Sequence, residues 1–174
     1  MFALVQQINA AMELGTYTTR SEEETIELGK QFAARLKPGD VVALYGDLGA
    51  GKTEFVKGIC AYFHVSQIVS SPTFTIINRY EGEDAAHHHV TLYHIDLYRI
   101  KSPKELEEIG LAECTEEETA IKLIEWAEKA NGTLPKHHYS IHFEFSPEDI
   151  NTRRIRISYD EEPQVESEEE KILV

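Results

Sequence analysis

The stretch VVALYGDLGAGKT, residues 41–53, joins a continuous apolar run to a glycine-rich loop. An apolar run without alternating polar positions is typical of a strand buried on both faces in a parallel sheet. From Thr53 to His64 the apolar side chains fall on one helical face, which predicts a helix directly after the loop. A buried strand, a loop and a helix in this order predict an α/β domain.

The loop itself, GDLGAGKT from Gly46 to Thr53, fits the pattern G-x-x-x-x-G-K-[ST] of the phosphate-binding loop, or Walker A motif. Glycines let the chain curl so that backbone N–H groups point at phosphate oxygens. Lys52 can reach the β- and γ-phosphates, the Thr53 hydroxyl can ligate Mg²⁺, and the helix start adds the positive end of its dipole. The sequence therefore predicts a site for a nucleoside triphosphate.

A phosphate-binding loop works with a second acid, which holds Mg²⁺ and typically ends a buried strand. Two carboxylates fit: Glu125 ends the run Ile121–Ile124, and Asp96 ends the run Val90–Ile95. The sequence does not decide which of the two carboxylates is the second acid, and for each the alternative is an acid that faces solvent at a strand end. Trp126 follows Glu125 directly. Half-buried packing and a role near the nucleotide or a partner are equally good interpretations of this tryptophan.

A short polar loop, Ser70–Thr75, lies between two predicted strands. Pro72 holds Ser71 in an extended conformation. Thr73 on such a loop could sense a γ-phosphate, as the switch loops of nucleotide switches do. An ordinary turn is an equally good interpretation of the segment.

The remaining elements follow from apolar spacing and turn residues. Ser21 and Glu24 form a capping-box pattern ahead of a helix that reaches Leu36. Further strands are predicted at 16–19, 68–69, 73–80, 90–95, 121–125, 139–145 and 154–159, and short helical pieces at 104–113 and 126–130, with a polar loop at 81–89. The pattern predicts a single P-loop NTPase domain with a central, mostly parallel or mixed sheet flanked by helices.

The chain has 174 residues and a net charge of −14. We place the domain at residues 16–159, after an N-terminal extension of residues 1–15. Residues 160–174 carry seven acids and one lysine, a net −6 that leaves −8 for the rest, and we expect this tail to be disordered. Such an acidic chain is a poor stand-alone binder of nucleic acid, because non-specific affinity comes from Lys and Arg contacts to phosphates.

Cysteine content and hydropathy bear on location. Two cysteines, Cys60 and Cys114, are too few for a disulfide framework. No apolar run approaches the ~20 residues needed to span a bilayer, and residues 1–14 lack the basic residues of a signal peptide. We therefore expect a cytoplasmic protein with no membrane contact.

Two histidine runs and one arginine cluster stand outside the motifs. His87-His88-His89 lies in a polar loop and is better interpreted as a solvated run than as a metal site, and His137-His138 is expected at the surface. Arg153, Arg154 and Arg156 form the main basic cluster. Arg153 or Arg154 could contact nucleotide or a partner, although salt bridges to the acidic body are the favoured interpretation.

Taken together, the motifs resemble the TsaE (YjeE) family, small P-loop ATPases of bacterial tRNA threonylcarbamoyladenosine synthesis. The matching stretches are GDLGAGKT at 46–53, SPTF at 71–74, HIDLYR at 94–99 and EW at 125–126. The resemblance covers about residues 16–159. Any P-loop protein has the first motif, whereas the four together are highly specific.

The resemblance implies roles for individual residues. ATP phosphates would be bound by Asp47, Leu48, Gly49, Ala50, Gly51, Lys52 and Thr53. Thr53 and Glu125 would hold Mg²⁺. The loop with Ser71 and Thr73 is similar to a switch I segment, Asp96 is similar to a switch II acid needed for activity, and Trp126 is the family's other characteristic residue.

The resemblance also implies partners and a task. Members of the family act with TsaD, the transferase subunit, and TsaB, its companion, and ATP hydrolysis resets that complex between rounds of transfer to adenosine 37 of tRNAs reading codons that begin with A. The tRNA would then be contacted only indirectly. The alternatives are a small-molecule P-loop kinase and a nucleotide switch that does not hydrolyse ATP. Arginine content argues against a kinase lid, because residues 97–120 hold only Arg99.

Overall fold

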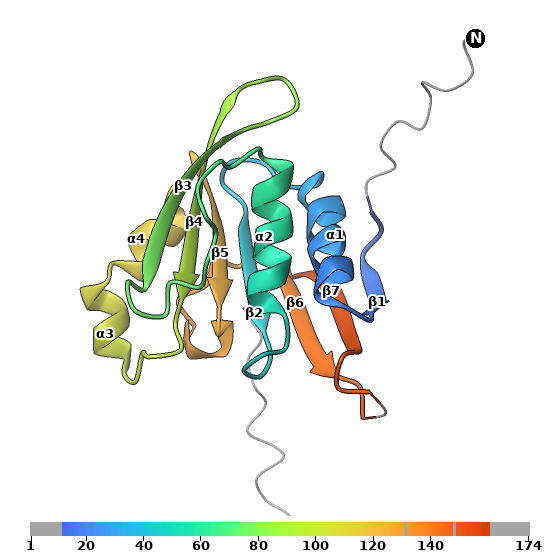
Figure 1. Ribbon diagram of the computed structural model, residues 1–174. Helices are drawn as coiled ribbons and strands as arrows, with labels where there is room; N and C mark the ends of the chain where they lie inside the picture. Colours follow the sequence, from blue (N-terminus) through green and yellow to red (C-terminus); the bar gives the residue numbers. More distant parts are fainter. Residues whose placement is uncertain (1–11, 131, 148, 161–174) are drawn as a thin grey trace, which may run out of the picture.

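The structure is a computed structural model that describes residues 12–130, 132–147 and 149–160 (Figure 1). Its strands are β1 (Gly15–Thr19), β2 (Val41–Tyr45), β3 (Ile77–Glu83), β4 (His89–Asp96), β5 (Ala120–Glu125), β6 (His138–Phe145) and β7 (Arg153–Asp160). Its helices are α1 (Glu22–Ala33), α2 (Lys52–Tyr62), α3 (Pro103–Glu108), α4 (Leu111–Glu116) and the 3-10 helix η1 (Ala127–Ala130). The predicted α/β class with a mixed sheet is confirmed.

The strands of the described residues form one mixed sheet in the order β1-β7-β6-β2-β5-β4-β3. Strand β2 pairs in parallel with β5 and β6, and β4 pairs in parallel with β5. The outer strands β3, β7 and β1 are antiparallel to their neighbours. Because parallel strands end at the same edge, the carboxyl ends of β2, β5 and β4 meet there, which is where α/β sheets bind ligands.

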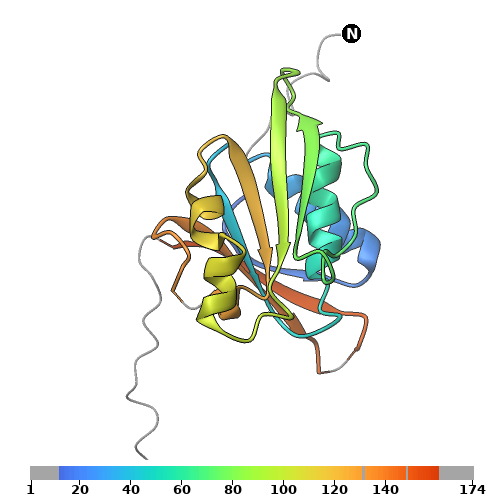
Figure 2. The ribbon, with the colours of Figure 1, turned by 90° about the vertical axis from the view of Figure 1, so that its left-hand side faces the viewer.

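Helices cover both faces of the sheet, and each face has its own apolar core (Figure 2). Along β2, Val42 and Leu44 belong to the core under α1 and α2, whereas Val41 and Ala43 belong to the core under α3, α4 and η1. This division explains why the run Val41–Tyr45 is apolar at every position: alternate side chains of a strand point to opposite faces.

Helices α1 and α2 lie side by side on one face (Figure 1). Helix α1 begins as predicted, with the Ser21 side chain accepting a hydrogen bond from the backbone N–H of Glu24. The helices cross very closely at two glycines. A Cβ atom on Gly29 would lie 2.2 Å from the carbonyl oxygen of Phe55, and one on Gly58 would lie 2.0 Å from that of Ile26.

Several predicted boundaries are wrong. Residues 68–69 form no strand, and Ile68 is 92% exposed instead of being packed in the sheet. The strand predicted at 73–80 begins only at Ile77 and continues to Glu83, since its antiparallel ladder with β4 extends into the predicted polar loop as far as the pair Glu83 and His89. The helix predicted at 104–113 is two short helices, separated at Gly110, which has the left-handed φ of 66°.

Both predicted terminal segments fall largely outside the described residues. The extension at 1–15 is described only from Met12 onward, and the acidic tail only at Asp160, the last residue of β7. Across the described ranges, no helix has the length and apolar content needed to cross a membrane.

Candidate functional site

The glycine-rich loop leaves the carboxyl end of β2 and enters α2 (Figure 1). Gly46, Gly49 and Gly51 have φ angles of 139°, 76° and 102°, a backbone region that residues with a Cβ atom rarely adopt. Gly51 is the N-cap of α2 and supplies no side chain to cap the helix. The first N–H groups of α2 therefore remain free of a side-chain cap, in the arrangement that binds anions at helix N-termini.

Lys52 is buried at the start of α2, with 4% of its surface exposed. Its Nζ donates to the carbonyl oxygens of Gly46 (2.6 Å) and Asp47 (2.9 Å) in the loop. Burial lowers the pKa of this ammonium, and the nearby carboxylates, Glu125 foremost, oppose that shift. The loop thus holds a cation at its centre by carbonyl contacts that an anionic ligand can replace.

Thr53 and Glu125 meet directly. The Thr53 hydroxyl donates to Glu125 Oε1 over 2.7 Å, and Nε2 of His94 lies 2.8 Å from the same oxygen. Glu125 ends β5, next to β2 in the sheet, which explains why it faces the start of α2. A hydroxyl and a carboxylate are hard oxygen ligands, and this donor set fits Mg²⁺.

Asp96 lies beside Glu125 but has different partners. The two residues are paired in the register of β4 and β5. Oδ2 of Asp96 accepts hydrogen bonds from Ser71 Oγ (2.6 Å) and Thr73 Oγ1 (2.7 Å), and Oδ1 accepts one from the backbone N–H of Tyr98 (2.8 Å). The two strand-end acids that the sequence left open are therefore adjacent, one facing Thr53 and the other tied to the 71–73 loop.

Trp126 connects these two parts of the site. Its ring centroid lies 4.0 Å from Lys52 Nζ, and its ring contacts that of Tyr98 at a centroid distance of 4.9 Å. The residue has a φ of 58°, which is uncommon for a large side chain. The backbone turns sharply after Glu125, and this turn brings the tryptophan over the lysine.

Arg153, at the start of β7, reaches the loop from the other side. Its Nη2 donates to the Gly49 carbonyl oxygen over 3.2 Å, and its guanidinium stacks on Phe145 at 4.4 Å. The favoured interpretation of a salt bridge holds instead for Arg154, whose Nη1 is 4.0 Å from Glu144. A cavity of about 420 Å³ lies here, lined by Ser21, Thr25, Gly49, Gly51, Asn151 and Arg153 among others.

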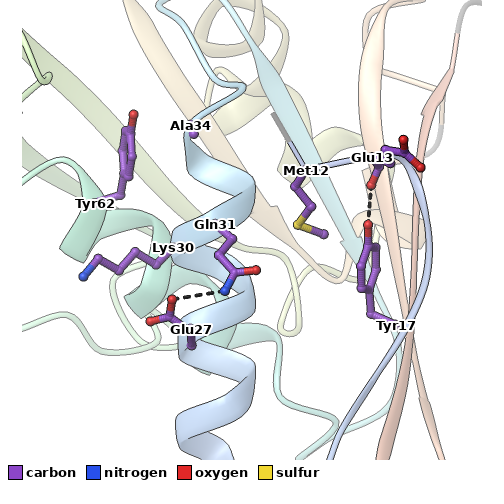
Figure 3. A pocket seen from close by; sticks show the side chains of 8 residues that line it. All are labelled: Met12, Glu13, Tyr17, Glu27, Lys30, Gln31, Ala34 and Tyr62. Carbon is purple, nitrogen blue, oxygen red and sulfur yellow. Dashed lines mark hydrogen bonds between the residues drawn. The ribbon is translucent and has the colours of Figure 1, made fainter. Parts of the chain in front are cut away.

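A second cavity, of about 530 Å³, lies away from the loop (Figure 3). Its lining comes from α1, the chain around β1, and the end of α2: Met12, Glu13, Tyr17, Glu27, Lys30, Gln31, Ala34 and Tyr62. It contains none of the predicted site residues. The convergence of Lys52, Thr53 and Glu125 therefore identifies the candidate site better than cavity size does.

The histidine runs do not join the site. His87, His88 and His89 pair with three different carboxylates, those of Glu83, Asp84 and Glu81. Within the described residues, no group of three or more His, Cys, Asp and Glu side chains is arranged to hold a metal ion. The surface prediction for His138 is wrong: it is 4% exposed and bonded to the Pro135 carbonyl oxygen.

The sequence patterns predicted no role for His94, although it lies in the HIDLYR segment at 94–99. Its signal was available, because residues two apart on a strand share a face. His94 is two residues before Asp96, so it lies on the face of β4 that carries the site.

The family model described as "Threonylcarbamoyl adenosine biosynthesis protein TsaE" matches residues 19–155. The chain belongs to the TsaE family. The resemblance stated from the four motifs is thereby confirmed, and with it a role in tRNA threonylcarbamoyladenosine biosynthesis and a P-loop NTPase fold.

Individual relatives agree with the family match. A protein of Rickettsia bellii named tRNA threonylcarbamoyladenosine biosynthesis protein TsaE is 46% identical over 116 residues, which are 66% of this chain and 76% of the relative. The Bacillus subtilis protein of the same name is 42% identical over 125 residues, 72% of this chain and 74% of the relative. The crystal structure of Bacillus subtilis YdiB superposes with a TM-score of 0.65 at 32% identity, covering 86% of this chain and 89% of that one.

Proposed function

We propose that this TsaE-family chain is an ATPase that binds ATP and Mg²⁺ at the glycine-rich loop. It would work as the accessory subunit of a TsaB–TsaD complex, which forms the threonylcarbamoyl group on adenosine 37 of tRNAs reading codons that begin with A. One observation carries the ATPase part: Lys52 is held inside the loop while Thr53 and Glu125 meet within 2.7 Å at its edge. Charge and metal ligands then converge where a triphosphate would lie.

Each residue of the loop has a task in this proposal. The backbone from Asp47 to Thr53 cradles the phosphates, with Leu48, Gly49, Ala50 and Gly51 contributing main-chain groups. Lys52 exchanges its carbonyl partners for phosphate oxygens. Thr53 and Glu125 hold the metal, which when bound neutralises charge on the β- and γ-phosphates.

Asp96 and the 71–73 loop form the moving part of the proposed cycle. Asp96 holds the hydroxyls of Ser71 and Thr73, so a γ-phosphate or its metal would compete for the same oxygens. Asp96 then orients the attacking water or signals its presence through the loop, as switch segments do. Trp126, between Lys52 and Tyr98, links the lysine to the segment after Asp96.

Partner action fits the surface around the loop. Three apolar side chains at this edge are exposed: Leu48 in the loop (72%), Phe74 after the switch segment (82%) and Tyr98 after Asp96 (43%). Arg99 stacks on Phe74, and Arg153 is bonded to Gly49. Neither arginine contacts Lys52 or Thr53 in the described structure, and a TsaB–TsaD complex would complete the site. The net charge of −14 also agrees with this proposal, because an acidic chain binds nucleic acid poorly and the partners would contact the tRNA instead.

The test is the rate of ATP hydrolysis with and without a cognate TsaB–TsaD complex. Slow turnover alone and faster turnover with the complex would support the proposal, and no stimulation would contradict it. ADP release that requires an added metabolite would favour a small-molecule kinase instead. ATP that stays intact in a single turnover with the partners would favour a switch without hydrolysis.

A further inference from the structure

We propose that His94 is a positioning residue for Glu125: its ring N–H holds the carboxylate so that the remaining oxygen faces the metal. This inference rests on the proposed Mg²⁺ site. Nothing in the family match assigns a role to this histidine. Three observations support the positioning role: the placement of His94 in the sheet, its burial and its single hydrogen bond.

Strand register puts the histidine beneath the site. On β4, His94 pairs with Leu123 of β5, and Asp96 pairs with Glu125. His94 and Asp96 share one face of β4, with His94 one step deeper in the sheet. From there its ring reaches across to the end of β5, where Nε2 lies 2.8 Å from Glu125 Oε1.

The position is one where an apolar side chain would be expected. His94 has 0% of its surface exposed, and its strand neighbours Leu92 and Ile95 are also completely buried. Burying an imidazole is unfavourable unless its nitrogens find partners. Here only one does: within the described part of the chain, Nδ1 of His94 is buried without a hydrogen-bond partner.

This asymmetry determines the direction of the bond. A carboxylate only accepts, so Nε2 carries a proton and donates it to Glu125, while Nδ1 has no hydrogen-bond partner among the described residues. Oε1 of Glu125 thus receives two hydrogen bonds, one from His94 and one from Thr53. In the described residues no hydrogen bond reaches Oε2.

The physical consequence is an oriented ligand. Two donors from different elements, β4 and α2, fix one oxygen of Glu125 and leave the other available. Residues that hold metal ligands in this way typically change metal affinity by about 10–100-fold when they are replaced. His94 therefore acts on the metal through Glu125 and has no contact of its own with ligand.

The experiment uses the full chain with His94→Asn and His94→Gln. The amide nitrogen of glutamine can occupy the level of Nε2, whereas that of asparagine lies near the level of Nδ1 and is too short to reach Glu125. The matched control is His138→Asn, which alters another buried histidine of the same sheet that is bonded to the Pro135 carbonyl oxygen. Two quantities are measured for each protein: the Kd of ADP in EDTA, and the Mg²⁺ concentration that half-saturates the ADP complex.

We expect His94→Asn to raise the half-saturating Mg²⁺ concentration by about 10-fold or more, with the Kd of ADP in EDTA changed less than about 2-fold. His94→Gln should stay within about 3-fold of wild type in both, as should His138→Asn. Circular dichroism establishes that each variant is folded.

Three results would overturn the inference. One is an unchanged Mg²⁺ requirement in a folded His94→Asn protein. Another is an equal loss of both affinities, which indicates a general packing role. The third is an identical defect in the asparagine and glutamine variants. A wild-type protein that binds ADP with no response to Mg²⁺ would instead refute the proposed metal site itself.

Discussion

Gly58 lies in the interior of α2, where exchanging glycine for alanine normally stabilises a helix by about 1 kcal/mol. The tertiary structure predicts the opposite sign for Gly58→Ala. The new Cβ atom would lie 2.0 Å from the Ile26 carbonyl oxygen and 2.8 Å from the Lys30 backbone nitrogen, both on α1. Real Cβ atoms essentially never approach closer than 3.0 Å. The two helices must therefore part by about 1 Å, a separation that close-packed interiors resist.

The magnitude follows from these two opposing effects. Overpacking costs about 1–3 kcal/mol, and the obstacle here is backbone rather than the end of a flexible side chain, which favours the upper value. Subtracting the helix gain of about 1 kcal/mol leaves a net loss of about 2 kcal/mol. For a chain of this size, that corresponds to a fall in Tm of about 4–8 °C.

Thermal unfolding followed by circular dichroism measures this change, and Gly15→Ala is the matched control. A Cβ atom on Gly15 would have nothing within 4 Å, so its Tm should stay within about 2 °C of wild type. If Gly58→Ala melts at or above the wild-type temperature, then the close crossing of α1 and α2 does not limit this position and the reasoning is refuted.

Three further predictions concern the loop and a buried lysine. Lys52→Ala should weaken ATP binding at least about 10-fold and abolish turnover while the Tm stays near wild type; calorimetric titration checks this, and unchanged affinity would remove the lysine from the site. Arg153→Ala should weaken ATP binding but leave inorganic triphosphate binding unchanged, because the cavity that Arg153 lines lies beside the phosphate-binding loop and would hold the nucleoside part of ATP. Arg154→Ala is the control. Equal losses of affinity for ATP and for triphosphate in Arg153→Ala would contradict this prediction. Lys122 is completely buried, donates to the carbonyl oxygens of Gly39, Glu117 and Ala120, and has a pKa lowered by burial. Since the unfolded lysine then binds more protons than the folded one, the free energy of unfolding should rise with pH between the lowered pKa and the ordinary pKa of 10.5, relative to Lys122→Met. Urea-unfolding profiles of the two proteins that stay parallel as the pH rises to 10.5 would refute this.

Local patterns in the sequence were sufficient for much of the site. The apolar run at 41–45, the glycine-rich loop and the start of α2 are contiguous, so their order alone predicts their geometry. The positions of Glu125 and Asp96 at strand ends were also predicted from the apolar runs that precede them. Patterns failed where pairing decides structure. Strand β3 extends to Glu83 because it pairs with β4, and the apolar Ile68, expected in a strand, is 92% exposed outside the sheet.

By itself, the sequence determined that this chain has a phosphate-binding loop between a buried strand and a helix, two candidate acids, and the four motifs of the TsaE family. Only the tertiary structure decided which acid faces Thr53, since that depends on β5 lying next to β2 with β4 beyond it. The contact of His94 with Glu125 and that of Arg153 with Gly49 were decided in the same way. Contacts between residues far apart in the chain follow from strand order and register, which single-strand periodicity does not encode.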